Sequence, residues 1–130
     1  MVAVSAAGPN LDAPVDPRFG RCAYFMIVDT DTMQYEAVPN TSLNAASGAG
    51  IQAAQTIAGK GVKAVLTGNI GPNAYQALSA ARIQIITGVT GTIKEAVTKY
   101  RKGEFKETNS PTVGGHFGIG KGRGMGRGRR

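Results

Sequence analysis

The residue types best suited to binding chemistry occur together near residue 20. Arg18 and Arg21 flank Phe19-Gly20, and Cys22 follows directly. Guanidinium groups make strong hydrogen bonds with anions, and a thiol is a soft ligand for iron, copper or molybdenum–sulfur species. These side chains predict a site for a bulky anion with metal or sulfur character. The competing interpretations are that both arginines are simply solvated and that Cys22 is a small packed residue.

Glycine-rich turns between predicted strands and helices offer further anion-binding groups. The segment Gly68-Asn69-Ile70-Gly71 breaks an apolar run, and Pro72-Asn73 restarts the chain with a residue type that favours the first turn of a helix. Backbone N–H groups at a helix start lack helical acceptors and carry partial positive charge, so they attract anions. A second turn, ending in Gly91 and Thr92, precedes the last predicted helix. Glycine turns also close tight connections without binding anything, and this alternative stays open.

The acidic and histidine residues argue against an enzyme. A two-metal hydrolase needs clustered carboxylates, and only Asp12 and Asp16 fall in a loop that could reach the predicted site. The only histidine, His116, lies in a glycine-rich C-terminal stretch, and no serine or cysteine is placed to act with it as a nucleophile. His116 could bind a metal ion, although an isolated histidine of this kind is more often unliganded. We therefore expect a binding protein and not a catalyst.

Apolar runs of strand length and helical patterns give the order of the elements that position these residues. The run Ala23 to Val28 is typical of a buried strand, and a short turn joins it to Met33 to Val38 as an antiparallel edge hairpin. The first helical pattern predicts a buried face that includes Ile51, and Thr92 with Glu95 predicts a capping box on the last helix. The expected strands are 2–7, 23–28, 33–38, 62–67 and 83–87, and the expected helices are 51–58, 72–81 and 93–102.

These elements predict an α/β protein with three layers, α/β/α, around a five-stranded mixed sheet. Right-handed strand–helix–strand crossovers place their strands in parallel, so we expect the strand order 3-2-1-4-5 with strand 2 antiparallel. The loop 8–21 and the turns 68–73 and 88–92 would then meet at the C-terminal edge of the parallel strands. Ligands in open α/β sheets usually bind at that edge.

Length and composition favour one core-forming domain in a reducing compartment. The 130 residues are 42% apolar, an ordinary value for a globular chain. No apolar stretch approaches the ~18 residues that span a bilayer, and the start of the chain lacks the basic segment of a secretory signal. The single cysteine, Cys22, excludes an internal disulfide framework. We expect a cytoplasmic protein with no membrane contact that is a monomer or a weak dimer.

The net charge of +7 is concentrated at the C-terminus. Residues 114–130 contain five basic residues and no acidic residue, whereas residues 1–113 contain ten basic and eight acidic residues. We expect residues 1–107 to form the α/β domain and residues 108–130 to be a disordered basic tail rich in glycine and arginine. Segments with such Arg-Gly spacing also bind RNA through charge, so weak nucleic-acid contact and a solubilising role are both open.

Four ordered motifs within residues 1–105 are specific in combination. They are Arg18-Phe19-Gly20-Arg21-Cys22-Ala23-Tyr24-Phe25, Gly48-Ala49-Gly50-Ile51-Gln52-Ala53-Ala54, Thr67-Gly68-Asn69-Ile70-Gly71-Pro72-Asn73-Ala74 and Gly88-Val89-Thr90-Gly91-Thr92-Ile93-Lys94-Glu95-Ala96. This series resembles the dinitrogenase iron–molybdenum cofactor-binding family, which includes NifX, the C-terminal domain of NifB and small stand-alone proteins. The resemblance implies a ribonuclease-H-like fold and the non-catalytic binding or carriage of metal–sulfur clusters of the iron–sulfur or iron–molybdenum type. Many relatives have a histidine where this chain has Arg18, so the resemblance supplies no histidine ligand there.

Two functions of different classes follow. In the first, the protein holds a metal–sulfur cluster or its anionic precursor at the shared edge and exchanges it with donor or acceptor proteins. Arg18 and Arg21 would neutralise charge, Cys22 would supply one soft contact, and the backbone of 68–73 and 91–92 would donate hydrogen bonds. In the second, the basic tail makes the protein a module that binds nucleic acid or a protein partner.

Overall fold

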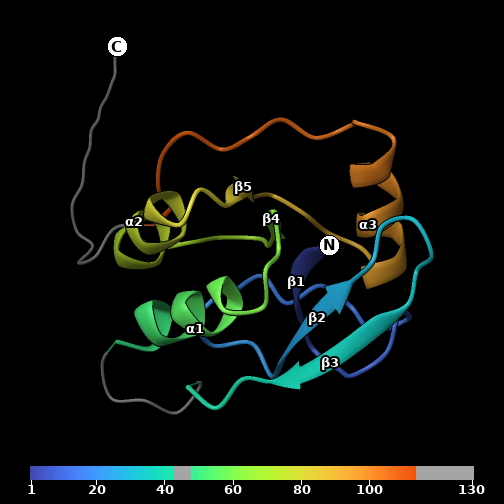
Figure 1. Cartoon of the computed structure of the whole chain (residues 1–130), viewed down its shortest axis with the longest axis horizontal. Coiled ribbons are helices and arrows are strands. Elements are labelled where there is room, and N and C mark those ends of the chain that lie inside the picture. Colours follow the sequence, from blue (N-terminus) through green and yellow to red (C-terminus); the bar gives the residue numbers. More distant parts are fainter. Residues whose placement is uncertain (43–47, 114–130) are drawn as a thin grey trace.

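The apolar runs pair into one five-stranded sheet in the order β3-β2-β1-β4-β5, as the sequence predicts. Figure 1 shows this sheet in the computed structural model, which describes residues 1–42 and 48–113. β2 runs antiparallel to both of its neighbours, whereas β1, β4 and β5 are parallel. The strands are β1 (Val2–Ala6), β2 (Tyr24–Val28), β3 (Tyr35–Pro39), β4 (Ala64–Leu66) and β5 (Gln84–Ile86).

Helices cover both faces of the sheet. α1 (Ala49–Ala58) and α2 (Pro72–Ala80) lie side by side on one face, where Ile57 and Leu78 are completely buried. α3 (Ile93–Arg101) covers the opposite face with Ile93 and Val97. Each face therefore has its own apolar cluster, and the expected three-layer arrangement is confirmed.

The start of α1 differs from the sequence-based expectation. α1 begins at Ala49, two residues before the expected start, and buries Ala49, Ala53 and Ile57. Ile51 was expected to face the core, but it is 36% exposed. The reason is the helical period, because Ile51 lies two positions from both Ala49 and Ala53 and so projects from a different side of the helix. This shift places the N-terminus of α1 at the edge where the predicted site lies.

The loop after β1 crosses that edge from one face of the sheet to the other. Val15 packs in the apolar cluster under α3, and Phe19 packs in the cluster under α1 and α2. Between them, the Asp16 N–H donates to the Ser5 carbonyl oxygen at 2.8 Å. The buried Ser5 hydroxyl donates to the Asp16 carbonyl oxygen and lies 2.7 Å from the Thr67 hydroxyl. These buried polar contacts fix the loop against β1 and the end of β4.

The chain after α3 returns across the sheet edge as a segment that we call the strap, residues 104–113. The Thr108 N–H donates to the Ile85 carbonyl oxygen at 2.7 Å, and the Thr112 N–H donates to the Ile70 carbonyl oxygen at 2.9 Å. Residues 108–113, which were assigned to the basic tail, thus hydrogen-bond to the α/β body. Residues 114–130, including His116, lie outside the described residues. In the described ranges, no helix is long and apolar enough to cross a bilayer.

Candidate functional site

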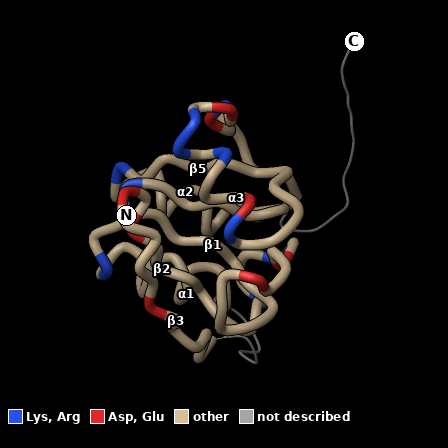
Figure 2. The backbone as a smooth tube through the Cα atoms, turned by 90° about the vertical axis from the view of Figure 1, so that its right-hand side faces the viewer, with Lys and Arg blue, Asp and Glu red and all other residues tan. Residues whose placement is uncertain are grey.

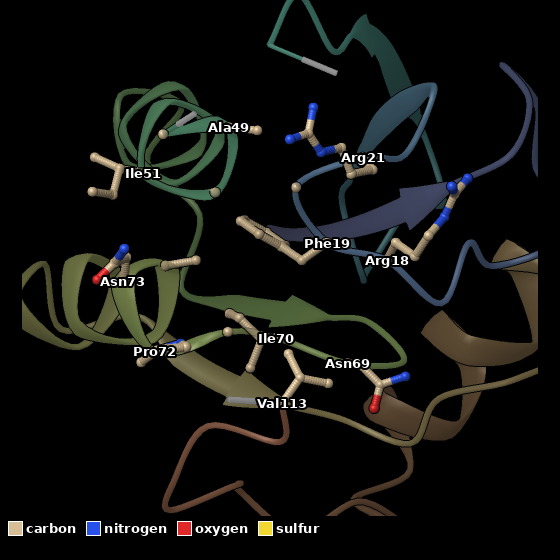
Figure 3. A pocket seen from close by; sticks show the side chains of 15 residues that line it. Arg18, Phe19, Arg21, Ala49, Ile51, Asn69, Ile70, Pro72, Asn73 and Val113 are labelled. Carbon is tan, nitrogen blue, oxygen red and sulfur yellow. The ribbon is translucent and has the colours of Figure 1, made fainter. Parts of the chain in front are cut away.

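A pocket of about 500 Å³ opens where α1, α2 and the loop after β1 meet. Phe19 lies at its centre between the two helix starts, and Ile51 and Asn73 lie together on one side (Figure 3). Val113 of the strap lies beside Ile70 and forms another part of the wall. The lining residues are Arg18, Phe19, Gly20, Arg21, Gly48, Ala49, Gly50, Ile51, Asn69, Ile70, Gly71, Pro72, Asn73, Ala74 and Val113.

Two helix N-termini face this pocket without side-chain caps. The N-cap positions of α1 and α2 are Gly48 and Gly71, and neither helix has a side-chain cap hydrogen bond. The first-turn N–H groups of a helix have no intrahelical acceptor, so those of Gly50, Asn73 and Ala74 carry partial positive charge at the pocket. Pro72 opens α2 without an N–H, as the sequence predicts.

Glycines allow the three pocket elements to approach one another closely. A Cβ atom on Gly20 would lie 3.1 Å from the Gly50 Cα and N atoms, so the arginine-bearing loop touches the start of α1. A Cβ atom on Gly50 would lie 3.3 Å from the Ala74 Cβ atom, so the starts of α1 and α2 also touch. Larger side chains at these positions would separate the elements and widen the pocket.

The turn 68–71 lines the pocket, but some of its N–H groups are already occupied. Asn69 N–H donates to the Pro17 carbonyl oxygen at 2.7 Å, and Ile70 N–H donates to the Thr112 hydroxyl at 2.8 Å. Asn69 and Ile70 therefore contribute surface to the site, while their N–H groups hold the turn in place. Gly68 does not line the pocket and packs against Pro17. The groups left to donate come from the helix starts.

The two arginines differ in how they relate to the pocket. Arg18 donates from its Nε and Nη2 atoms to the Asp16 carboxylate, both at 3.3 Å, and its side chain points away from Phe19 and Ile70 (Figure 3). The Asp16 side chain is only 8% exposed, so this ion pair is buried on one side. Hydrogen bonding to Asp16 raises the pKa of Arg18. The Arg21 side chain is exposed and extends near Ala49 at the pocket. Arg21 is thus better placed than Arg18 to contact an anion in the pocket.

Cys22 is placed in the core and not among the pocket residues. It is completely buried, and its thiol donates to the Phe19 carbonyl oxygen at 3.3 Å. Burial raises the pKa of Cys22 to about 12. A thiol that keeps its proton is a poor metal ligand, because thiolate is the coordinating form. The structure favours the packing interpretation of this residue.

Gly91 and Thr92 lie on the α3 side of the edge and do not line the pocket. The Thr92 N–H donates to the Glu95 carboxylate at 2.8 Å, and the Glu95 N–H donates to the Thr92 hydroxyl, which confirms the predicted capping box. The next two N–H groups of α3, those of Ile93 and Lys94, donate to carbonyl oxygens of the loop after β1. The N–H groups at the start of α3 therefore already have hydrogen-bond acceptors within the protein.

The three segments expected at one edge do meet there. Short backbone bridges join Pro14 to Thr92 and Arg18 to Asn69, so the loop after β1 contacts both glycine turns. The pocket, however, forms on the α1 and α2 side only. Sequence reasoning missed the start of α1, Phe19 and Val113 as lining residues. The Gly48-Ala49-Gly50 motif was the available signal for α1, whereas nothing in the sequence indicated Val113.

Comparisons with known proteins agree with this fold. The dinitrogenase iron-molybdenum cofactor family matches residues 1–103. The orange protein from Desulfovibrio gigas, solved in its apo form, is 44% identical with a TM-score of 0.83, covering 85% of this chain and 94% of that chain. A proposed NifB protein from Thermotoga is 34% identical with a TM-score of 0.73, covering 85% and 97%. An uncharacterized protein from Methanocaldococcus jannaschii is 33% identical over 96 residues, which are 72% of this chain and 81% of the relative.

Proposed function

The chain belongs to the dinitrogenase iron-molybdenum cofactor family, and from this premise we propose that it binds and carries an anionic metal–sulfur cluster, or an anionic precursor of one, without catalysing a reaction. The pocket at the starts of α1 and α2 is the proposed seat of this cargo. The observation that carries the proposal is the meeting of two uncapped helix N-termini with an arginine-bearing loop at one pocket.

The charge of the pocket suits an anion. Each helix start contributes about half a positive charge, and the exposed Arg21 side chain is a further cation at the same opening. The charge of Arg18 is shared with Asp16, so Arg18 adds less. Asn73 brings a side-chain amide as a further donor at the same opening.

The remaining lining suits a sulfur surface more than a small oxyanion. Phe19 and Ile70 are buried beneath the pocket, and Ile51 and Val113 are exposed apolar side chains at its rim. Sulfide surfaces are large, polarizable and weakly hydrated, so apolar contact costs them little desolvation. A fully hydrated small oxyanion would gain little from these walls. The mixture of donors and apolar walls supports a metal–sulfur cargo.

The cargo would be held without coordination by side chains of the described residues. No group of three or more His, Cys, Asp or Glu residues that could hold a metal ion occurs in residues 1–42 and 48–113. The Cys22 thiol is buried, and the Asp16 carboxylate accepts hydrogen bonds from Arg18.

Holding a cluster through charge and packing suits carriage, because release breaks no metal–ligand bond. The cargo would pass between donor and acceptor proteins through the open side of the pocket, where Arg21, Ile51 and Val113 are exposed. The orange protein from Desulfovibrio gigas is described in an apo form. We propose that this chain likewise has an apo state, from which it takes up its cargo.

The direct test is anaerobic titration of the purified full chain with tetrathiomolybdate and with reconstituted iron–sulfur species. Visible absorption and elemental analysis after gel filtration would measure uptake. Asn73→Asp should weaken uptake at least tenfold, because the added carboxylate faces the anion at the start of α2. The same change should leave the helix stable, since a negative charge near a helix N-terminus is favourable.

Gln84→Glu is the matched control, because it makes the same change in charge at the start of β5, away from the pocket. This variant should take up the cargo as the unaltered chain does. Equal uptake by the chains carrying Asp at position 73 and Glu at position 84 would remove the pocket from the proposal. No uptake by the unaltered chain would overturn the function itself.

A further inference from the structure

The strap adds a wall to the proposed pocket from beyond the part of the chain that the family matches. The match covers residues 1–103, and the strap follows it. At the end of the strap, the Thr112 N–H donates to the Ile70 carbonyl oxygen at 2.9 Å, and the Thr112 hydroxyl accepts the Ile70 N–H at 2.8 Å. The Val113 N–H also donates to the Ile70 carbonyl oxygen, at 3.3 Å. Both strap residues are thus attached to the turn 68–71 through its backbone.

These contacts place an apolar side chain at the pocket. Val113 lines the pocket beside Ile70 and is 46% exposed (Figure 3). A Cβ atom on Gly71 would lie 3.8 Å from the Val113 Cγ2 atom, so the valine methyl groups reach the start of α2. The Ile70 N–H donates to Thr112 and is therefore not available to a ligand. The strap thus takes up one backbone donor of the turn and adds methyl groups to the wall.

Two tetrahedral dianions, tetrathiomolybdate and molybdate, show what such a wall distinguishes. They carry the same charge, so the helix starts and Arg21 attract both. The basic and acidic residues interspersed over the described part of the chain also act on both (Figure 2). Oxo ligands are strong hydrogen-bond acceptors that lose hydration at an apolar wall, whereas sulfur is polarizable and accepts hydrogen bonds weakly. Discrimination between the two anions therefore depends on the groups that touch them.

We propose that Val113 is a specificity-determining residue that makes the pocket select sulfur-surfaced anions over oxyanions, and that Thr112 is the positioning residue that holds it. The inference rests on the proposed function and names the part of the chain that sets its selectivity. Phe19 and Ile70 are 2% and 1% exposed, so little of their surface is left for a ligand to cover. The Val113 side chain has such surface, and covering about 40 Å² of it would change the affinity about fivefold.

The experiment is anaerobic calorimetric titration of the full chain with tetrathiomolybdate and with molybdate, at the same pH and ionic strength. The measured quantity is the ratio of the two dissociation constants. Val113→Thr replaces a methyl group by a hydroxyl group at nearly equal volume and leaves the net charge unchanged. Val38→Thr is the matched control, because Val38 lies on the edge strand β3 and does not line the pocket.

We expect the unaltered chain to bind tetrathiomolybdate at least about tenfold more tightly than molybdate. Val113→Thr should lower this preference about fivefold, because the hydroxyl weakens the apolar contact with sulfur and can donate to an oxo ligand. Val38→Thr should leave the preference unchanged. An unchanged preference in Val113→Thr, or an equal loss in both threonine variants, would overturn the inference.

The positioning role of Thr112 is tested with two further variants. Thr112→Ala removes the hydroxyl that accepts the Ile70 N–H, so Val113 would be held at the wall by fewer contacts. Its preference for tetrathiomolybdate should fall as in Val113→Thr. Thr112→Ser keeps the hydroxyl and should keep the preference of the unaltered chain. An unchanged preference in Thr112→Ala, or a loss in Thr112→Ser equal to that in Thr112→Ala, would overturn the positioning role.

Failure of the inference differs from failure of the proposed function. If the unaltered chain takes up no tetrathiomolybdate, both fall together. If uptake occurs and depends on Asn73, but the unaltered chain binds molybdate equally well, the anion site stands and the selectivity is overturned. Thermal unfolding checks the folding of each variant, and little loss of stability is expected in the strap variants because Thr112 and Val113 are exposed.

Discussion

Gly68 and Pro17 are in direct contact at the sheet edge. A Cβ atom on Gly68 would lie 2.6 Å from the Pro17 Cα atom and 2.9 Å from its carbonyl oxygen. The same carbonyl oxygen accepts the Asn69 N–H at 2.7 Å, so the glycine turn and the loop after β1 are locked together by backbone atoms. This contact places the arginine-bearing loop against the start of α2, and the shape of the pocket depends on it.

Gly68→Ala should therefore destabilise the protein by about 2 kcal/mol, because the added methyl group meets backbone that cannot move aside cheaply. Gly71→Ala is the control, since its Cβ atom would lie 3.8 Å from the nearest atom and its φ angle is −85°. That change should cost less than about 1 kcal/mol. Urea unfolding of both variants measures the difference. Equal stabilities would mean that the contact with Pro17 does not constrain the turn.

The Cys22 thiol should affect stability at high pH and not cargo uptake. Its pKa is raised to about 12 by burial, from a reference value of 9.0. Between pH 9 and pH 12 the thiol ionises in the unfolded chain but keeps its proton in the folded chain, so stability is lost as pH rises. The loss can reach about 1.4 kcal/mol per pH unit. Cys22→Ala removes this contribution, so the stability difference between the unaltered chain and the variant should shrink above pH 9.

The Cys22→Ala variant also tests whether the Cys22 thiol coordinates the cargo. Cys22→Ala should take up tetrathiomolybdate with unchanged stoichiometry, because the thiol is buried away from the pocket. Iodoacetamide should modify the native chain at pH 7.5 far more slowly than the urea-unfolded chain. Loss of uptake in a folded variant would restore Cys22 as a ligand.

The sheet could be predicted from sequence because its signals are local. The apolar runs, the short turn after β2 and the right-handed crossovers together determine the strand order. The Thr92–Glu95 capping box was equally local, since both partners lie within one helical turn. The ends of the elements were predicted less accurately than their order. α1 begins at Ala49, before the first strongly apolar residue Ile51, because Ala49 and Ala53 are buried by tertiary contacts.

The site was predicted only in part because it depends on contacts between distant segments. The pairing of Arg18 with Asp16 follows from a loop conformation that the sequence does not encode locally. The wall formed by Val113 depends on the strap, in which Thr112 hydrogen-bonds to Ile70, 42 residues earlier in the sequence. The closure of the α3 start by the loop after β1 is similarly non-local. The residue types in the sequence predict a site for an anion. Tertiary packing determines which of the predicted hydrogen-bond donors lie at the pocket.

Thr92→Ala should lower the stability of the protein without changing the binding of cargo at the sheet edge. The Thr92 hydroxyl accepts the Glu95 N–H at 3.1 Å, so its loss should cost about 1 kcal/mol in urea unfolding. The Thr92 backbone N–H donates to the Glu95 carboxylate and lowers the pKa of Glu95. That contribution to stability is present above the unfolded pKa and is lost as pH falls through the folded one, but the N–H remains in the variant, so the cost of the substitution should change little in acid. Uptake of tetrathiomolybdate should not change, and weakened uptake would place the α3 start in the site.

Arg21 should matter more for binding than Arg18. Both are exposed arginines of the same loop, so Arg21→Gln and Arg18→Gln are matched changes. Arg21 extends at the pocket, whereas Arg18 points away from it and shares its charge with Asp16 (Figure 3). We expect Arg21→Gln to weaken tetrathiomolybdate binding about fivefold at low ionic strength, equivalent to ~1 kcal/mol, and Arg18→Gln less than about twofold. Equilibrium titration at 0.02 M and 0.3 M salt measures both effects, and the difference should shrink at high salt. A larger effect of Arg18→Gln would mean that the Asp16 ion pair opens when the cargo binds.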